Sequence, residues 1–308
     1  MNVLVVIFGG LDHEFLARWD CPNLRQAEWG KVVVDELWND RDVATQITAQ
    51  LITGKTWREN GVNDRKKNFY TYHNRRIRWL EEKVFRNMRR GAARRRRFYQ
   101  AFGWLSIVSR EFLKADLTCP TLFDRIPNSK AVYVPAYNPE PSWALDRNIL
   151  DPRRYPDLGV EGALDLREKN FSWRRRKFME ALTQDPPCNL LMGQFQYIDS
   201  TQHLYLSYVE PPRMDEVEKA YRAMDAFAGE ILAAARGRYE RILFISDNGA
   251  ARKKDFRPTH HNRPFYSINE SLHITKNNLR DFHEHILSWV SAAGAPSRAS
   301  RDDVVRCA

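Results

Sequence analysis

The sequence lacks the closely spaced cysteines of a zinc finger or a disulfide-stapled fold. Its 308 residues include four cysteines, and no two of them form a C-x-x-C pair. They are far apart along the chain: Cys21, Cys119, Cys188 and Cys307. The spacing excludes the common cysteine-based metal motifs and favours a reducing compartment.

Long hydrophobic runs are also absent. The opening MNVLVVIFGG has no basic n-region, and its apolar run is too short for a signal peptide or a membrane span. We therefore expect a cytoplasmic protein in which this run is the first strand. Hydrophobic residues make up 43% of the chain, far more than in a disordered protein. The length suits one large α/β domain or two small ones.

Positive charge is present in excess and is concentrated in one segment. The formal charge is +10, which is typical of proteins that meet nucleic acid, an anionic membrane surface or a phosphorylated substrate. Residues 65–97 contain fourteen Lys and Arg and two Glu, a local charge of +12. We predict a main domain over 1–295, a basic helical insertion or cap at 63–117, and a flexible tail at 296–308. The segment 65–97 is a candidate to bind an anionic membrane surface or nucleic acid.

Apolar runs that alternate with helical patterns indicate the fold class. Strands are predicted at 3–8, 131–134, 190–197, 241–245 and 264–268, and helices at 215–235 and 279–292. This alternation predicts an α/β fold with a mainly parallel central sheet and helices on both faces. Ligands of such sheets bind beyond the carboxyl ends of the strands. The residues after Phe8, Tyr197 and Ile245 are therefore the places to look for chemistry.

Two strand ends carry groups that bind metals. "FQYIDSTQHLY" places Asp199 and His203 four residues apart, on one face of a helical turn if one begins there. That spacing suits two ligands of one divalent metal, although it also arises by chance or from helix capping. "ILFISDNGA" ends a strand in Asp247 and Asn248, which form either a plain turn or the edge of a site.

Two further segments offer a histidine pair and a hydroxyl. His260 and His261 precede the last predicted strand in a chain with eight histidines, and the alternative is an ordinary surface pair. In "VATQITAQLITGKTWRENGV", Thr45 is placed to cap a helix that ends near Gly54. The functional alternative is that Thr45 is an exposed nucleophile at a helix N-terminus.

Together, in this order over residues 3–269, the segments resemble the alkaline phosphatase superfamily. The resemblance is closest to its type I phosphodiesterase/nucleotide pyrophosphatase and sulfatase-like members. It is carried by "VLVVIFGGLDHEFLARWDCPNLRQAEWG", "ATQITAQLITGKTWRENGV", "FQYIDSTQHLY", "ILFISDNGA" and "HHNRPFYSIN". The basic insertion has no counterpart in it.

The resemblance implies a metal-dependent hydrolase or transferase that acts on a phosphoric ester, either a diester or a monoester. It implies one or two divalent ions, zinc or manganese first, with calcium or magnesium as alternatives. The first ion is expected on Asp199, His203 and either His260 or His261; the second is expected to face Thr45, Asp247 and Asn248. Two ions would bracket the attacking and leaving oxygens of an in-line displacement, with Thr45 as nucleophile. A phosphorylated small molecule or a polyanion is the expected substrate.

Some positions depart from the family pattern. Gly9 stands where the resemblance expects a carboxylate, and Asp12, three residues further on, is the candidate substitute. Asn248 and Asn60 stand where histidines are expected. Amide and carboxylate oxygens suit a hard ion better than zinc.

The nucleophile segment departs as well. Thr45 lies eight residues before Thr53 where nine is usual, so Thr48 is a second candidate for the nucleophile. The Cys/Ser-x-Pro-x-Arg signature of sulfatases is missing, which disfavours sulfatase activity. These departures leave an alternative function open: a non-catalytic member with a degenerate metal site, which binds anionic ligands, nucleic acid or membrane through its basic insertion.

Overall fold

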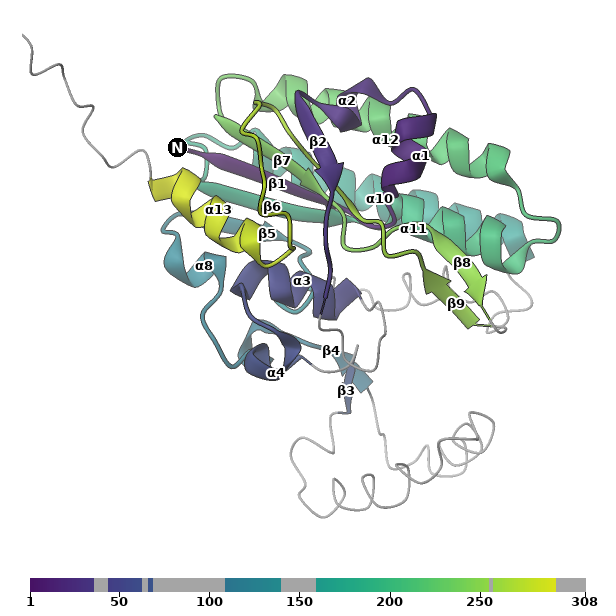
Figure 1. The fold of residues 1–308 in the computed structure, drawn as a ribbon, viewed down its shortest axis with the longest axis horizontal. Coiled ribbons are helices and arrows are strands. Elements are labelled where there is room, and N and C mark those ends of the chain that lie inside the picture. The colour runs from purple at the N-terminus through teal and green to yellow at the C-terminus, as the bar shows by residue number, and fades with distance from the viewer. Residues whose placement is uncertain (36–43, 63–65, 69–108, 140–158, 255–256, 292–308) are drawn as a thin grey trace, which may run out of the picture.

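A six-stranded mixed sheet forms the centre of the protein. The computed structural model describes residues 1–35, 44–62, 66–68, 109–139, 159–254 and 257–291 (Figure 1). The strand order is β2-β10-β7-β1-β6-β5. The strands are β1 (Val3–Phe8), β2 (Glu28–Lys31), β5 (Ser129–Val132), β6 (Leu190–Phe195), β7 (Arg241–Ile245) and β10 (Phe265–Ile268).

Strand β1 lies in the middle of the sheet because all six of its residues are apolar and buried. It pairs in parallel with β6 on one side and β7 on the other, and β5 continues the parallel pairing beyond β6. A strand that is covered on both faces has a continuous apolar sequence, as β1 has. The predicted α/β fold with a mainly parallel sheet is confirmed.

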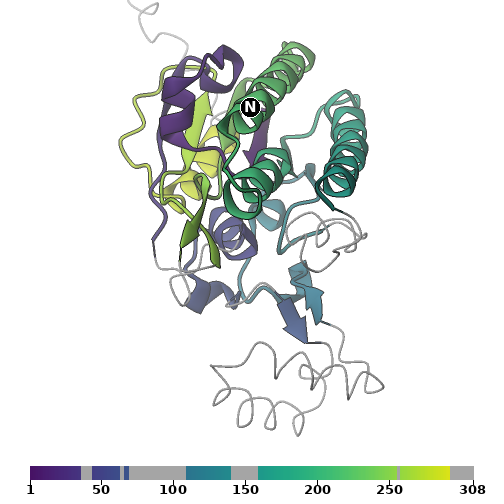
Figure 2. The ribbon, with the colours of Figure 1, turned by 90° about the vertical axis from the view of Figure 1, so that its right-hand side faces the viewer.

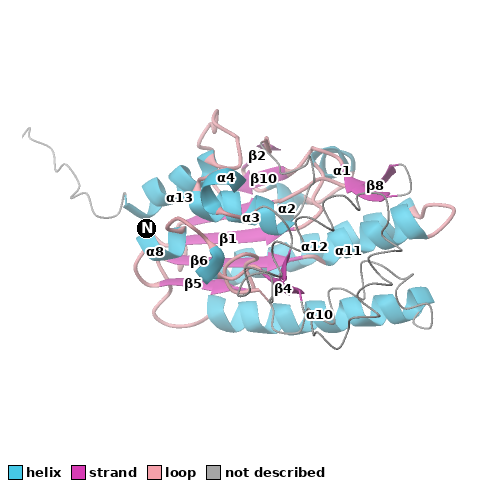
Figure 3. Cartoon of the chain, turned by 90° about the horizontal axis from the view of Figure 1, so that it is seen from below, coloured by secondary structure: helices cyan, strands magenta, loops and turns pink. Residues whose placement is uncertain are grey.

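Helices cover both faces of the sheet. One face packs against α3 (Ala44–Thr53), α8 (Leu122–Arg125) and α13 (Asp281–Ser291). The other packs against α1 (His13–Arg18), α2 (Pro22–Arg25), α10 (Gly159–Leu182) and α12 (Met214–Ala235). Figures 2 and 3 show α10 and α12 running beside the sheet, and the Phe171 and Phe227 rings join these two helices at 5.3 Å.

Some boundaries and directions differ from the sequence-based expectation. The strand predicted at 131–134 ends at Val132, because Tyr133 has a left-handed backbone with φ 55°. The strand predicted at 190–197 ends at Phe195, and Tyr197 already belongs to the next helix. β10 runs antiparallel to β7, so the sheet is mixed at that edge.

Two short antiparallel ribbons lie outside the main sheet. One pairs β3 (Lys66–Asn68) with β4 (Ser109–Glu111), so the chain leaves the described part after β3 and returns beside it. The predicted basic segment 65–97 and the tail 296–308 lie almost entirely outside the described residues. The other ribbon pairs β8 (Ala251–Lys254) with β9 (Arg257–His260).

The remaining described elements are short: α4 (Trp57–Asn60), a 3-10 turn (Lys114–Asp116), α11 (Tyr197–Gln202) and a π-helical turn (His203–Tyr208).

Three of the four cysteines lie in the described part of the chain. Cys21, Cys119 and Cys188 are free thiols. Within the described ranges, no helix combines the length and the apolar character that crossing a bilayer requires.

Glu28 holds the loop after β10 against the sheet edge. Its carboxylate accepts backbone N–H groups from Leu272, His273 and Ile274 at 2.6–2.7 Å and the Tyr266 hydroxyl at 3.2 Å. Burial alone would raise the pKa of Glu28, but these donors outweigh it and hold the pKa below its usual value.

We expect Glu28→Gln to lower the free energy of unfolding by about 1–3 kcal/mol at pH 7, because an uncharged amide accepts these bonds less well. The folded-state pKa of Glu28 is depressed, so this stabilisation is present above the unfolded pKa and is lost as pH falls through the folded pKa. Urea denaturation at pH 7 and at acidic pH checks both points. Glu230→Gln, which breaks an exposed ion pair with Arg175, is the control.

Candidate functional site

A helical turn begins directly after β6 and carries the first candidate ligand. The Asp199 N–H donates to the Gly9 carbonyl at 3.1 Å, which fixes α11 against the end of β1. Gly10 has φ 81°, and a Cβ there would stand 2.8 Å from the Asp199 Cα. Only glycine therefore allows the loop after β1 to approach α11 this closely.

Three buried side chains converge at this end of the sheet. The His260 Nε2 atom lies 2.9 Å from the Asp199 Oδ1 atom and 3.0 Å from the His203 Nε2 atom. The His203 Nε2 and Asp199 Oδ1 atoms are 3.6 Å apart. Asp199 and His203 face the same way because they are four residues apart on continuous helical backbone, as predicted. We call Asp199, His203 and His260 the triad.

The β8–β9 ribbon brings in the third member. His260 pairs with Ala251, and the Ala251 N–H donates to the Gln202 Oε1 atom at 3.0 Å. The Gln202 amide in turn donates to the Gly10 carbonyl and to the Tyr221 hydroxyl. Gln202 is fully buried, so it ties the ribbon to α11 and to the loop after β1. His261, the alternative to His260, is not in the converging group.

The donor set of the triad fits a divalent transition metal. Two imidazole nitrogens and one carboxylate oxygen lie within 4.8 Å of one another, and all three residues are buried. Zinc and manganese accept such mixed nitrogen and oxygen ligands. Three protein ligands also leave a coordination position open, as catalytic zinc sites require.

Asp247 lies beside the triad at the end of β7. Its Oδ2 atom accepts N–H groups from Gln194 at 2.9 Å and from Gln196 at 3.5 Å. Burial, reinforced by the negative charge of Asp199, raises the pKa of Asp247 to about 7. Without a nearby positive charge, the ionised form of Asp247 therefore costs the folded protein free energy.

Asp12, the candidate substitute for Gly9, caps a helix and pairs with an arginine. Its Oδ1 atom accepts the Glu14 and Phe15 N–H groups and caps α1. Its Oδ2 atom accepts the Ala250 N–H and lies 3.2 Å from the Arg263 Nε atom. Both oxygens thus already have partners within the protein.

Gln196 occupies the space that a side chain at position 9 would need. A Cβ on Gly9 would lie 2.1 Å from the Gln196 Oε1 atom and 2.7 Å from its Cδ atom. The two residues lie side by side because β1 and β6 pair in register, with Phe8 opposite Phe195. Gln196 belongs to no motif in the sequence; the signal for it there is a polar residue immediately after a buried strand.

The predicted nucleophile lies at the start of α3. Thr45 is the second residue of the described helix, not its cap as predicted, and its side chain is buried. Thr48, one turn later, is buried with no hydrogen-bond partner for its hydroxyl among the described residues. Asn60, placed where a histidine was expected, accepts the Val62 N–H and donates to the Lys55 carbonyl, so it closes a turn.

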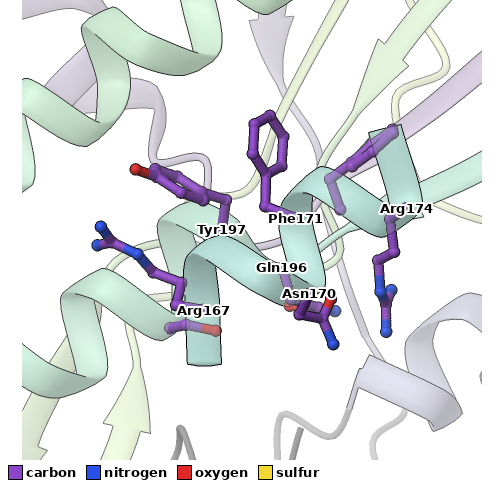
Figure 4. Close-up of a pocket in the computed structure, with 8 residues that line it drawn as sticks. Arg167, Asn170, Phe171, Arg174, Gln196 and Tyr197 are labelled. Carbon is purple, nitrogen blue, oxygen red and sulfur yellow. The ribbon is translucent and has the colours of Figure 1, made fainter. Parts of the chain in front are cut away.

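A recess of about 10 Å³ adjoins the site on the side of α10. Figure 4 shows Arg167, Asn170, Phe171 and Arg174 of α10 facing Gln196 and Tyr197 across it. The buried Arg174 guanidinium donates to the Gln194 carbonyl at 3.2 Å. Positive charge therefore lies beside the carboxyl ends of the strands, on a residue of the basic run WRRRK at 173–177.

Comparison with known proteins identifies the family. A family model described as type I phosphodiesterase / nucleotide pyrophosphatase matches residues 48–298, which is most of the chain. The protein therefore belongs to the type I phosphodiesterase / nucleotide pyrophosphatase family, and the predicted resemblance is confirmed. This is a family of phosphoric-ester hydrolases that generally use divalent metals. No curated protein matches the sequence.

Solved structures with similar folds are distant in sequence. Murine ectonucleotide pyrophosphatase / phosphodiesterase 5 is 13% identical with a TM-score of 0.46, and the match covers 82% of this chain and 59% of that one. A sulfatase from Pseudoalteromonas sp. is 14% identical with a TM-score of 0.47, and the match covers 96% of this chain and 68% of that one. The chain thus spans about three fifths of the murine protein.

Proposed function

We propose that the protein hydrolyses a phosphoric ester, with a divalent metal held by the triad and Thr45 as the nucleophile. The observation that carries the proposal is the convergence of Asp199, His203 and His260 in a buried group beside Asp247. When bound, the metal would supply positive charge that stabilises the phosphoryl oxygens and an alkoxide. Zinc or manganese suits the triad best.

Each residue has a role in this proposal. The Thr45 hydroxyl gives up its proton to solvent and its Oγ atom attacks phosphorus; the ester bond in line with it breaks, and the leaving oxygen takes up a proton from solvent. Water then cleaves the phosphothreonine and regenerates the hydroxyl. Asp12 positions the β7 loop by accepting the Ala250 N–H and pairing with Arg263. The Arg174 guanidinium adds positive charge beside the strand ends, which favours an anionic substrate.

The test is turnover of bis-p-nitrophenyl phosphate and p-nitrophenyl phosphate by protein that has been stripped with a chelator and then reloaded with zinc, manganese or calcium. We expect no turnover of either ester without metal, and turnover that returns with zinc or manganese. p-Nitrophenyl sulfate serves as the comparison substrate and is expected to be turned over least. Failure with every metal would overturn the proposal and favour the non-catalytic alternative.

A further inference from the structure

His260 reaches the triad from a ribbon that lies outside the main sheet. Asp199 and His203 follow β6 on continuous helical backbone, so the end of the sheet fixes their positions. β9, which carries His260, pairs with β8 in a separate two-stranded sheet. The hydrogen bonds of the main sheet therefore do not place His260, and other contacts must hold the ribbon against α11.

Gln202 makes such a contact directly beside His260. Ala251 lies opposite His260 in the ribbon, and its N–H donates to the Gln202 Oε1 atom at 3.0 Å. The Gln202 Nε2 atom donates to the Gly10 carbonyl at 2.9 Å and to the Tyr221 hydroxyl at 3.1 Å. The completely buried carboxamide thus uses its oxygen and its amino group to join the ribbon to α11, α12 and the loop after β1.

The partners of Gln202 determine which end of its carboxamide faces the ribbon. The Ala251 N–H can only donate, so it requires the Oε1 atom, and the Gly10 carbonyl can only accept, so it requires the Nε2 atom. The Tyr221 hydroxyl donates to the same Gly10 carbonyl and accepts the Asp12 N–H. A flipped carboxamide would oppose donor to donor and acceptor to acceptor, so these contacts hold the side chain in one orientation.

We propose that Gln202 is a positioning residue for the metal ligand His260. By holding the ribbon, it brings the imidazole to the other two triad members before any metal binds. Gln202 lies three residues after Asp199 and directly before His203, so one stretch of helix carries two ligands and the group that places the third. A preformed donor set binds a metal more tightly, because no ligand has to be ordered on binding. The inference rests on the triad of the proposed function, but not on Thr45 or on hydrolysis.

Calorimetric titration of metal-stripped protein with zinc or manganese measures what Gln202 contributes to the site. Gln202→Met keeps an unbranched side chain of similar length and removes the carboxamide, so we expect the dissociation constant to rise by about 10–100-fold. Gln26→Met is the matched control, since the Gln26 amide bonds Ser267, outside the triad. It should bind metal as the wild type does. Unchanged affinity in Gln202→Met would overturn the inference.

The reaction of histidines with diethyl pyrocarbonate, mapped by mass spectrometry in metal-free protein, tests the positioning without a metal. We expect His260 to react at least about fivefold faster in Gln202→Met than in the wild type, because the ribbon opens locally. His283, which is buried on α13, is the internal reference and should react at its wild-type rate. An unchanged rate at His260, or an equal rise at His283, would contradict a specific role for Gln202.

Hydrogen exchange in the metal-free wild type needs no variant and is therefore independent of misfolding. The Ala251 N–H is expected to exchange at least about 10³-fold more slowly than in an unfolded peptide, because Gln202 holds it. Exchange at the unfolded rate would show that Gln202 does not hold the ribbon. Failure of the wild type to bind any metal would overturn the proposed function, whereas the His260 and Ala251 measurements decide the positioning separately.

Discussion

The His203→Ala variant is expected to lose zinc or manganese almost completely while it keeps its fold. His203 is one of three converging ligands, and its Nε2 atom lies 3.0 Å from that of His260. Because two protein ligands hold a dication far less well than three, we expect metal content to fall from about one ion per chain to near zero. We also expect ester turnover to fall by at least about 10²-fold. Elemental analysis of purified protein, together with the turnover assay, measures both.

The matched control is His285→Ala on α13, since the His285 imidazole contacts the Lys276 carbonyl at 3.0 Å and stacks on Trp289, outside the triad. It should keep the metal and the activity of the wild type. Equal metal content in His203→Ala and wild type would show that the triad does not hold the ion. Circular dichroism of both variants guards against misfolding.

The Thr45→Ala variant is expected to keep its metal and lose turnover. If Thr45 is the nucleophile, removing its hydroxyl removes the attacking atom but none of the three triad ligands. We expect kcat to fall by at least about 10³-fold, with unchanged metal stoichiometry. Thr45→Ser retains a hydroxyl and should retain part of the rate.

Thr48→Ala is the informative comparison, because Thr48 is buried one turn further along α3. A small effect in Thr48→Ala with a large one in Thr45→Ala supports the assignment. The reverse pattern would identify Thr48 as the nucleophile. Wild-type rates in both variants would show that neither threonine is the nucleophile.

Most of the sheet could be predicted because its central strands are continuous apolar runs. β1 and β7 begin and end where the sequence predicted, and α12 begins one residue early. Helix α10 was missed, since charged and polar residues interrupt its apolar face and even Asn170 and Arg174 are buried. β8 was missed because its sequence, ARKK, carries no apolar alternation.

The site could be predicted only in part. Residues at i and i+4 of a helix lie on the same face, so the sequence spacing of Asp199 and His203 was enough to predict that their side chains lie together. The choice between His260 and His261 depends on the pairing of β9 with β8, because adjacent strand residues point to opposite sides. Gln196 was missed because a carboxamide carries no charge, and its importance comes only from its contact with Gly9.

The central position of β1 has a consequence for biosynthesis. β1 is synthesised before its two neighbours, β6 and β7, which begin at Leu190 and Arg241. The apolar segment Val3–Phe8 therefore has neither partner strand until the chain has been synthesised at least to Leu190. Pairing across such long sequence separations makes folding slow and leaves an aggregation-prone strand exposed meanwhile. The segment at the centre of the native sheet thus stays unpaired through much of its synthesis.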